Sequence, residues 1–296
     1  MGGGSYNYTR ARSRSTINSY RSNAEIFSQR TISSEMDIRG KVREARDSEE
    51  HPESFPVIIA LDTTGSMGDI PRDLVTKSLP AIMKAIIDAD IPHPQLCFLG
   101  VGDAYYDDCP IQCGQFESSD ELMEKWLKLV YLEGGGGGNG GESYNLAWYF
   151  AARHTSIDSF IKRNQKGVLI TIGDEPCHKA LSKSAIERFF GDSVEGDMTS
   201  TQLLEKVREQ WNPFHIQMGD GQWDYSVIKG WEALIGKENL IVLPREDYKL
   251  IPVITSVICK VYGVNSNTLD TKVSDNRITD TGVTDTEDKK ENKITL

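Results

Sequence analysis

Short apolar runs alternate along the chain with segments in which apolar residues recur at helical spacing, and this alternation predicts an α/β fold. The runs predict strands at 55–61, 96–101, 167–172, 214–218 and 240–243, with a short edge strand between 109 and 116. Helical spacing predicts helices at 69–87, 121–131, 142–154, 182–190, 200–210, 224–235 and about 246–261. Pro80 is expected to kink the first of these helices. Strand and helix in repeated succession are typical of a doubly wound, mostly parallel sheet with helices on both faces.

The two ends of the chain lack this pattern. Residues 1–50 are rich in Ser, Arg and Asn and have no sustained apolar period before Ile26 and Phe27, so they predict a basic, flexible N-terminal arm. Residues 263–296 repeat Thr, Asp and Asn, and we expect a disordered tail there. The folded domain is therefore assigned to residues 51–262.

Composition fits a globular protein of the cell interior. The 296-residue chain is 38% hydrophobic and 26% charged, which permits a sizeable core. Its apolar runs fall short of the roughly 18 residues that a membrane-spanning helix requires, and its first residues lack the apolar stretch of a secretory signal. The five cysteines are scattered and odd in number. We therefore expect a cytoplasmic protein with reduced thiols and no membrane partner.

Charge is distributed unevenly between the arm and the domain. Residues 1–46 hold nine Lys and Arg against four Asp and Glu, whereas residues 47–262 hold nineteen against thirty-three. A body of that sign repels nucleic acid, and the basic arm is too dilute to reverse the repulsion. Nucleic acid is therefore not the expected partner.

Three polar segments follow predicted strands or lie between them, at the edge where an open parallel sheet binds ligands. The first strand is followed by 62–68, the strand at 167–172 by 173–176, and the glycine-rich stretch 134–143 lies between the two. In the first segment Asp62, Thr64 and Ser66 occupy alternate positions and can face the same way. One carboxylate and two hydroxyls form an oxygen set that suits Mg²⁺ or Mn²⁺ and leaves a position open for a partner's carboxylate.

The sequence Asp62-x-Thr64-x-Ser66, with a glycine-rich loop and then Asp174 after an apolar strand, resembles the metal-ion-dependent adhesion site of von Willebrand factor type A (vWA) domains. The resemblance covers roughly residues 54–262. It implies a six-stranded, doubly wound fold with Mg²⁺ or Mn²⁺ at one edge. It also implies direct ligation by Thr64 and Ser66, with Asp62 and Asp174 in support.

The middle loop departs from the usual family pattern, because no Thr occurs between Gly134 and Ser143. Asn139-Gly140-Gly141-Glu142 instead resembles the variant of integrin β subunits and of the A domains of alpha-kinase-type proteins, in which a Glu approaches the metal. Glu142 is therefore the fifth candidate ligand, and Asn139 a weaker one. Three carboxylates would make the site net negative, so it should bind the ion readily but attract an acidic partner less strongly.

The leading functional hypothesis is a non-enzymatic, metal-dependent protein–protein binding module, in which a partner's Asp or Glu completes the metal shell. Resemblance to intracellular vWA proteins of bacteria and phages implies an adaptor for a MoxR-type AAA+ ATPase, a kinase or a phosphatase. The alternative is a haloacid dehalogenase-like, metal-dependent phosphatase with Asp62 as nucleophile. Position 64, where such an enzyme needs a second Asp as general acid, is Thr.

Other interpretations of the same residues stay open at the level of sequence. Asp62 could cap the following helix, and Glu142 could be a first-turn helix carboxylate. The glycine run lacks the Gly-Lys-Ser/Thr ending of a P-loop, so nucleotide binding there is disfavoured. Two further sets could be sites or ordinary surface and core residues: a second cation site at Asp103, Asp107 and Asp108, and a zinc site at Cys109, Cys113, Cys177 and His178. Trp223, in the loop 219–224, could contact a partner.

Overall fold

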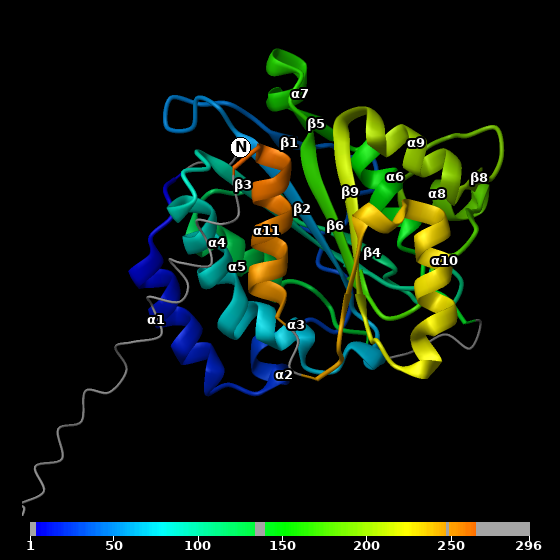
Figure 1. Ribbon diagram of the computed structural model, residues 1–296, viewed down its shortest axis with the longest axis horizontal. Helices are drawn as coiled ribbons and strands as arrows, with labels where there is room; N and C mark the ends of the chain where they lie inside the picture. Colours follow the sequence, from blue (N-terminus) through cyan, green and yellow to red (C-terminus); the bar gives the residue numbers. More distant parts are fainter. Residues whose placement is uncertain (1–3, 134–139, 247–248, 265–296) are drawn as a thin grey trace, which may run out of the picture.

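A six-stranded sheet forms the centre of the computed structural model, which describes residues 4–133, 140–246 and 249–264 (Figure 1). The strand order is β10 (Leu240–Leu243), β9 (Trp211–Met218), β6 (Gly167–Gly173), β2 (Phe55–Asp62), β3 (Pro94–Val101) and β4 (Ile111–Cys113). Every neighbouring pair is parallel except β3 and β4, which are antiparallel. The predicted fold class, including the short edge strand, is confirmed.

Chain order places the ligand-binding edge of this sheet next to β2. The chain runs from β2 to β3 on one side and later returns to β6 on the other side. Strand order therefore reverses between β2 and β6, and such a reversal opens a crevice at the carboxyl ends of the strands. Asp62 is the last residue of β2, and Asp174 directly follows β6.

Helices cover both faces of the sheet, because successive side chains of its buried strands point to opposite cores. On β2, Val57, Ile59 and Leu61 enter one core and Ile58 and Ala60 enter the other. Figure 1 shows the two helical layers. The first layer contains α1 (Tyr8–Ser19), α3 (Ile70–Asp73), α4 (Leu79–Asp88), α5 (Asp120–Lys128) and α11 (Leu250–Tyr262). The second contains α6 (Asn145–Arg153), α8 (Lys183–Phe189), α9 (Ser200–Gln210) and α10 (Tyr225–Ile235).

Short elements complete the chain. They are α2 (Asn23–Ile26), α7 (Asp158–Arg163), the parallel pair β1 (Arg43–Ala45) and β5 (Thr155–Ile157), the antiparallel pair β7 (Ala180–Leu181) and β8 (Met198–Thr199), and the 3₁₀ turns η1 (Gly65–Met67), η3 (Gln222–Asp224) and η4 (Lys237–Asn239). A π-helical turn, η2 (Leu74–Ser78), joins α3 to α4 immediately before Pro80. Because Pro80 lacks an amide hydrogen and its ring crowds the preceding turn, the irregularity lies where the kink was expected.

The N-terminal segment corrects the sequence prediction of a flexible arm over residues 1–50. From residue 4 onward it is packed on the domain: α1 contacts α4 and η2, and β1 pairs with β5. Its buried apolar residues are Ala11, Ile26, Phe27, Met36, Ile38 and Ala45. Arg10 and Arg14 pair with acidic residues of α5. The arm docks largely through ion pairs and isolated apolar residues, so no apolar period in its sequence announces the contact.

The C-terminal prediction falls almost entirely outside the described residues, because α11 ends at Tyr262 and residues 265–296 are not among them. Within the described ranges, no helix combines the length and the apolar character needed to cross a membrane.

Candidate metal centre

Asp62 lies at the end of β2 with none of its surface exposed, and both of its carboxylate oxygens accept hydrogen bonds. Oδ1 accepts from the Thr64 amide at 2.9 Å and from Thr64 Oγ1 at 2.6 Å. Oδ2 accepts from the hydroxyl of Tyr144 at 2.7 Å. The first two bonds form a tight turn after the strand, which is a local preference of Asp. They hold the Thr64 hydroxyl beside the carboxylate.

A continuous line of oxygens leads from this turn to the neighbouring strand. Thr64 Oγ1 lies 3.1 Å from Ser66 Oγ, and Ser66 Oγ donates a hydrogen bond of 2.9 Å to Asp174 Oδ1. Gly68, with φ of +53°, permits the reversal that returns the chain from this turn into α3. Four of the five predicted ligands are therefore linked across the switch point. This is the arrangement that the resemblance to von Willebrand factor type A domains implies.

Comparison of the sequence with protein families and with curated proteins identified no relative: no family model matches the chain, and no curated protein matches it. Matching solved structures include the pilus adhesin SpaC from Lactobacillus rhamnosus GG in its open conformation, with a TM-score of 0.44, 8% identity, and coverage of 80% of this chain and 31% of the adhesin.

Two further matches have similar scores. Proximal thread matrix protein 1 from the mussel byssus, with a zinc-occupied MIDAS motif, has a TM-score of 0.42, 11% identity, and coverage of 75% of this chain and 46% of that one. The conserved hypothetical protein BatB from Bacteroides thetaiotaomicron has a TM-score of 0.42, 13% identity, and coverage of 71% and 100%. This chain spans less than half the length of the adhesin and of the thread protein.

Glu142, the fifth candidate of the vWA site, is fixed through its backbone. Its amide donates to the Pro176 carbonyl at 2.8 Å, and its carbonyl accepts from the His178 amide at 3.0 Å. This pairing places Glu142 outside the helix, because α6 begins only at Asn145. The side chain is 3% exposed, and its Oε2 has no hydrogen-bond partner among the described residues. A buried oxygen without a partner is costly unless a further group binds it.

The pKa values of Asp62 and Glu142 are both raised, because burial and neighbouring carboxylates disfavour their charged forms. Burial raises the pKa of Asp62 to about 6, the charge of Asp174 adds to the rise, and the hydrogen bonds from Thr64 and Tyr144 oppose it. Burial also raises the pKa of Glu142 to about 9, with the charge of Asp62 as the next cause. Closely spaced carboxylates raise one another's pKa in this way when no cation neutralises them.

The donor set fits a hard divalent cation. Carboxylate and hydroxyl oxygens are the ligands of Mg²⁺ and Mn²⁺, and Glu142 Oε2, which has no partner among the described residues, is an oxygen of the same type. Across residues 4–133, 140–246 and 249–264, no three His, Cys, Asp or Glu side chains are grouped so that they could hold a metal by themselves. An ion at this edge would therefore depend on the hydroxyls of Thr64 and Ser66.

Arg245 belongs to the site but is absent from the predicted set. Its Nη1 donates to Asp174 Oδ2 at 2.7 Å, and its Nη2 donates to Asp224 Oδ1 at 3.2 Å. Arg245 lies two residues beyond the end of β10, at the same edge of the sheet as the other strand ends. That position was the only signal in the sequence that could have suggested it.

Tyr144 is the second residue that the sequence did not reveal. It is fully buried, and besides Asp62 its hydroxyl oxygen lies 3.4 Å from the amide of Glu175. A Cβ atom placed on Gly173 would lie 1.8 Å from that hydroxyl oxygen. Glycine at this position therefore leaves the room in which Tyr144 reaches Asp62.

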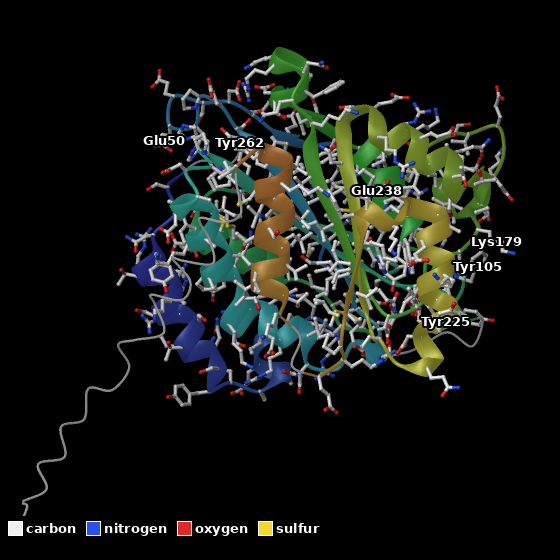
Figure 2. All side chains as sticks on the ribbon, in the orientation of Figure 1. Glu50, Tyr105, Lys179, Tyr225, Glu238 and Tyr262 are labelled. Atoms are coloured by element: carbon white, nitrogen blue, oxygen red, sulfur yellow. The ribbon has the colours of Figure 1, made fainter. Side chains whose placement is uncertain are left out.

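The second cation site suggested by Asp103, Asp107 and Asp108 has no support in the structure. Asp103 Oδ1 accepts from the Tyr105 amide and lies 3.0 Å from His178 Nε2, while Asp107 Oδ2 accepts from the Asp103 amide. The carboxylates of Asp103 and Asp107 each bind a backbone amide of their own loop. Tyr105 and Lys179, which are labelled in Figure 2, both line a cavity of about 640 Å³.

The structure also bears on the zinc site, the glycine run and Trp223, which the sequence left open. Cys109, Cys113, Cys177 and His178 do not assemble a zinc site within the described part of the chain. Asn139 and the glycine run 134–138 lie outside the described residues. The backbone of Trp223 belongs to η3, but its side chain is not described.

Proposed function

We propose that this vWA domain is a non-enzymatic, metal-dependent protein-binding module. Mg²⁺ or Mn²⁺ would be held by Asp62, Thr64, Ser66, Glu142 and Asp174, and a partner's Asp or Glu would complete its shell. Two observations carry the proposal. Glu142 Oε2 is buried without a partner among the described residues, and the charge of Asp62 helps to raise the pKa of Glu142. Asp62, Thr64, Ser66 and Asp174 form a line of linked hydroxyl and carboxylate oxygens.

Each residue has a separate task in this proposal. Thr64 and Ser66 present neutral hydroxyls, Asp62 holds Thr64 in place, and Asp174 orients Ser66. Tyr144 fixes the rotamer of Asp62 from the core side. The bound ion supplies positive charge and an open ligand position. Neutral hydroxyl ligands leave more of the ion's charge available to an incoming carboxylate than carboxylate ligands would.

The geometry gives less support to the phosphatase alternative. A nucleophilic carboxylate needs an oxygen directed at its substrate, but both oxygens of Asp62 accept hydrogen bonds and the residue is fully buried. The adjacent hydroxyl of Thr64 has no acidic proton to give a leaving group. Hydrolysis of a generic phosphate ester tests this alternative directly. Hydrolysis by the wild type that disappears in Asp62→Asn would show that the protein is an enzyme and would contradict the binding-module proposal.

The family resemblance extends the proposal to candidate partners. These are a MoxR-type AAA+ ATPase, a kinase or a phosphatase, for which the domain would serve as an adaptor. Each candidate would have to present an exposed Asp or Glu to the metal edge.

A pulldown with the immobilised full chain tests the proposal. We expect partners that are retained in Mg²⁺ and lost in chelator, and that Ser66→Ala no longer retains. Ser184→Ala is the matched control, because Ser184 is also an exposed serine whose Oγ contacts a neighbouring hydroxyl, at 3.0 Å, but it lies on α8. Partners retained equally with and without chelator, or equally by Ser66→Ala, would contradict the metal-dependent function.

A further inference from the structure

A pair of histidines lies at the end of the sheet opposite the metal edge, where β2 and β3 begin. His51 precedes β2, and His93 directly precedes β3. The two Nδ1 atoms lie 3.3 Å apart, and the ring planes are inclined at 71°. His51 Nε2 lies 2.9 Å from the carbonyl oxygen of Gly4. The pair therefore connects the starts of two strands to the first described residue of the chain.

The hydrogen bonds of this pair determine where its protons lie. A carbonyl oxygen can only accept, so His51 Nε2 carries the hydrogen that binds Gly4. In the neutral ring His51 Nδ1 is then an acceptor, and His93 Nδ1 donates to it. One added proton fits this arrangement at His93 Nε2, which makes no hydrogen bond among the described residues. A second does not fit, because both Nδ1 atoms would then carry hydrogens that face each other.

The groups around the pair also disfavour a second positive charge. Four carboxylates lie on the adjoining loops: Asp47, Glu50, Glu53 and Asp90. Burial and the charge of His51 lower the pKa of His93, and they outweigh the opposing charges of Glu53 and Asp47. Tyr6, which lines the same cavity as both histidines, keeps its proton because burial raises its pKa. The pair is therefore the group in this cavity that changes charge in mildly acidic solution and also holds the N-terminal segment.

Gly4 is held at this place by residues 50 and 51. Its amide donates to Glu50 Oε2 at 2.9 Å, and its carbonyl accepts from His51 (Glu50 is labelled in Figure 2). His93 is tied to the sheet instead, because its carbonyl accepts from the Phe55 amide at 3.0 Å. When the two rings repel each other, the contact with Gly4 can therefore be lost while the strands stay in place.

We propose that the histidine pair is a proton-sensitive latch, which holds residues 4–6 on the domain while the pair carries at most one positive charge and releases them when both rings are protonated. Release would enlarge a cavity of about 380 Å³, because Ser5 and Tyr6 line one side of it. The surface exposed in this way is apolar and includes Met83, Ile87 and Ile91.

The next contact along the chain limits the release to these residues. The Asn7 amide donates to Asp120 Oδ1 at 3.1 Å. Burial tends to raise the pKa of Asp120, but hydrogen bonds from Arg14 and Arg10 outweigh it and lower the pKa. Asp120 therefore stays ionised in mildly acidic solution, and α1 should remain docked while residues 4–6 are released.

The pH dependence of the latch has a defined sign. In the released form His93 should titrate near the usual histidine pKa of about 6.5, whereas its pKa is lower in the latched form. The released form therefore binds more protons, so the latch is fully effective above about pH 6.5 and weakens as the pH falls below it. Because the two forms differ by one proton, the ratio of released to latched chains should rise by up to about tenfold per pH unit.

The test is an NMR measurement on the isotope-labelled full chain between about pH 7.5 and about pH 5. We expect the backbone heteronuclear NOE of residues 4–6 to fall to that of a mobile chain end in acid, while the NOE of α1 stays constant. His93→Asn removes one titrating ring and retains a residue that tolerates the left-handed φ of +52°. His51→Gln retains an amide donor for the Gly4 carbonyl. Both variants should keep residues 4–6 ordered at the lower pH, and His51→Gln decides the test if His93→Asn does not fold.

The matched control is His178→Gln, which removes a histidine that lies 3.0 Å from Asp103 at the metal edge. It should release residues 4–6 as the wild type does. Residues 4–6 that stay equally ordered across this pH range in the wild type would overturn the latch. Acid release that persists in both His93→Asn and His51→Gln would assign it to the carboxylates and overturn the inference. Loss of order in α1 at the same pH would show general acid unfolding and would also overturn it.

Discussion

Two groups of carboxylates in this protein have similar composition and opposite surroundings. In the first, between the N-terminal segment and α5, Arg14 Nη2 lies 2.5 Å from Asp120 Oδ2 and its Nε lies 2.6 Å from Glu124 Oε2. In the second, at the metal edge, Arg245 contacts Asp174. Among the described residues, no Lys or Arg forms an ion pair with Asp62 or Glu142.

The pKa values of the two groups shift in opposite directions. Burial tends to raise the pKa of Asp120 and of Glu124, but hydrogen bonds from Arg14, Arg10 and Lys128 outweigh it and both pKa values are lowered. At the metal edge burial prevails, and the pKa values of Asp62 and Glu142 are raised. The fold therefore supplies its own cations where carboxylates serve structure. At the metal edge it leaves a charge deficit that an external cation can fill.

The largest expected effect is a loss of Mn²⁺ affinity when a carboxylate of the metal edge is neutralised. Glu142→Gln keeps the shape of the side chain but removes its charge, and we expect Mn²⁺ affinity to fall by at least about a hundredfold, or roughly 2.7 kcal/mol. Electron paramagnetic resonance of free Mn²⁺ measures this. Glu117→Gln is the matched control, because Glu117 is also buried, has a raised pKa and has an Oε2 without a partner in the described structure. Equal Mn²⁺ affinity in both variants would show that the unpaired oxygen of Glu142 does not mark a metal site.

The next largest effect is a loss of stability when the carboxylates of α5 that pair with the N-terminal segment are altered. Asp120→Asn removes the charge that Arg10 and Arg14 share, and we expect unfolding in denaturant to show a loss of about 2 kcal/mol. Hydrogen exchange should increase in α1. Asp88→Asn, which breaks the surface pair with Lys84, should cost less than about 0.5 kcal/mol.

The same variant has a pH dependence with a defined sign. Because the folded-state pKa of Asp120 is depressed, its stabilisation is present above the unfolded value near 3.8 and is lost as pH falls through the folded value. The stability difference between wild type and Asp120→Asn should therefore shrink as the pH falls below about 4. A difference independent of pH would show that Asp120 acts through shape and not through charge.

A smaller effect is expected when a single tyrosine hydrogen bond to an Asp is removed, either at the metal edge or elsewhere in the protein. Tyr144→Phe removes the donor to a buried Asp62 oxygen, and Tyr149→Phe removes a 2.6 Å bond to Asp192 outside the site. Each should cost about 1 kcal/mol of unfolding free energy. Only Tyr144→Phe should also alter Mn²⁺ affinity, since Tyr144 orients a candidate ligand. A change in Mn²⁺ affinity in both variants, or in neither, would contradict this role.

The sequence predicted those parts of the molecule whose determinants are local. The strands appear as apolar runs, and Asp62, Thr64 and Ser66 lie within five residues of one another, so both the sheet and half of the candidate site were predictable. Asp174 followed because parallel strands end at one edge. Arg245 and Tyr144 reach the site only through the tertiary fold. The docking of the N-terminal segment depends on Arg10 and Arg14 meeting α5 about 110 residues later, which no periodicity records.

We infer that the metal edge binds one divalent cation. The most direct measurement is the unfolding free energy of the full chain as Mg²⁺ or Mn²⁺ is raised from zero in chelator-treated buffer. The account predicts a logarithmic rise that reaches roughly 2.7 kcal/mol at a hundredfold excess over the dissociation constant, and no rise in Ser66→Ala. A wild-type stability that is independent of either ion, together with an Asp62→Ala variant that does not fold, would make Asp62 a structural cap and contradict the account.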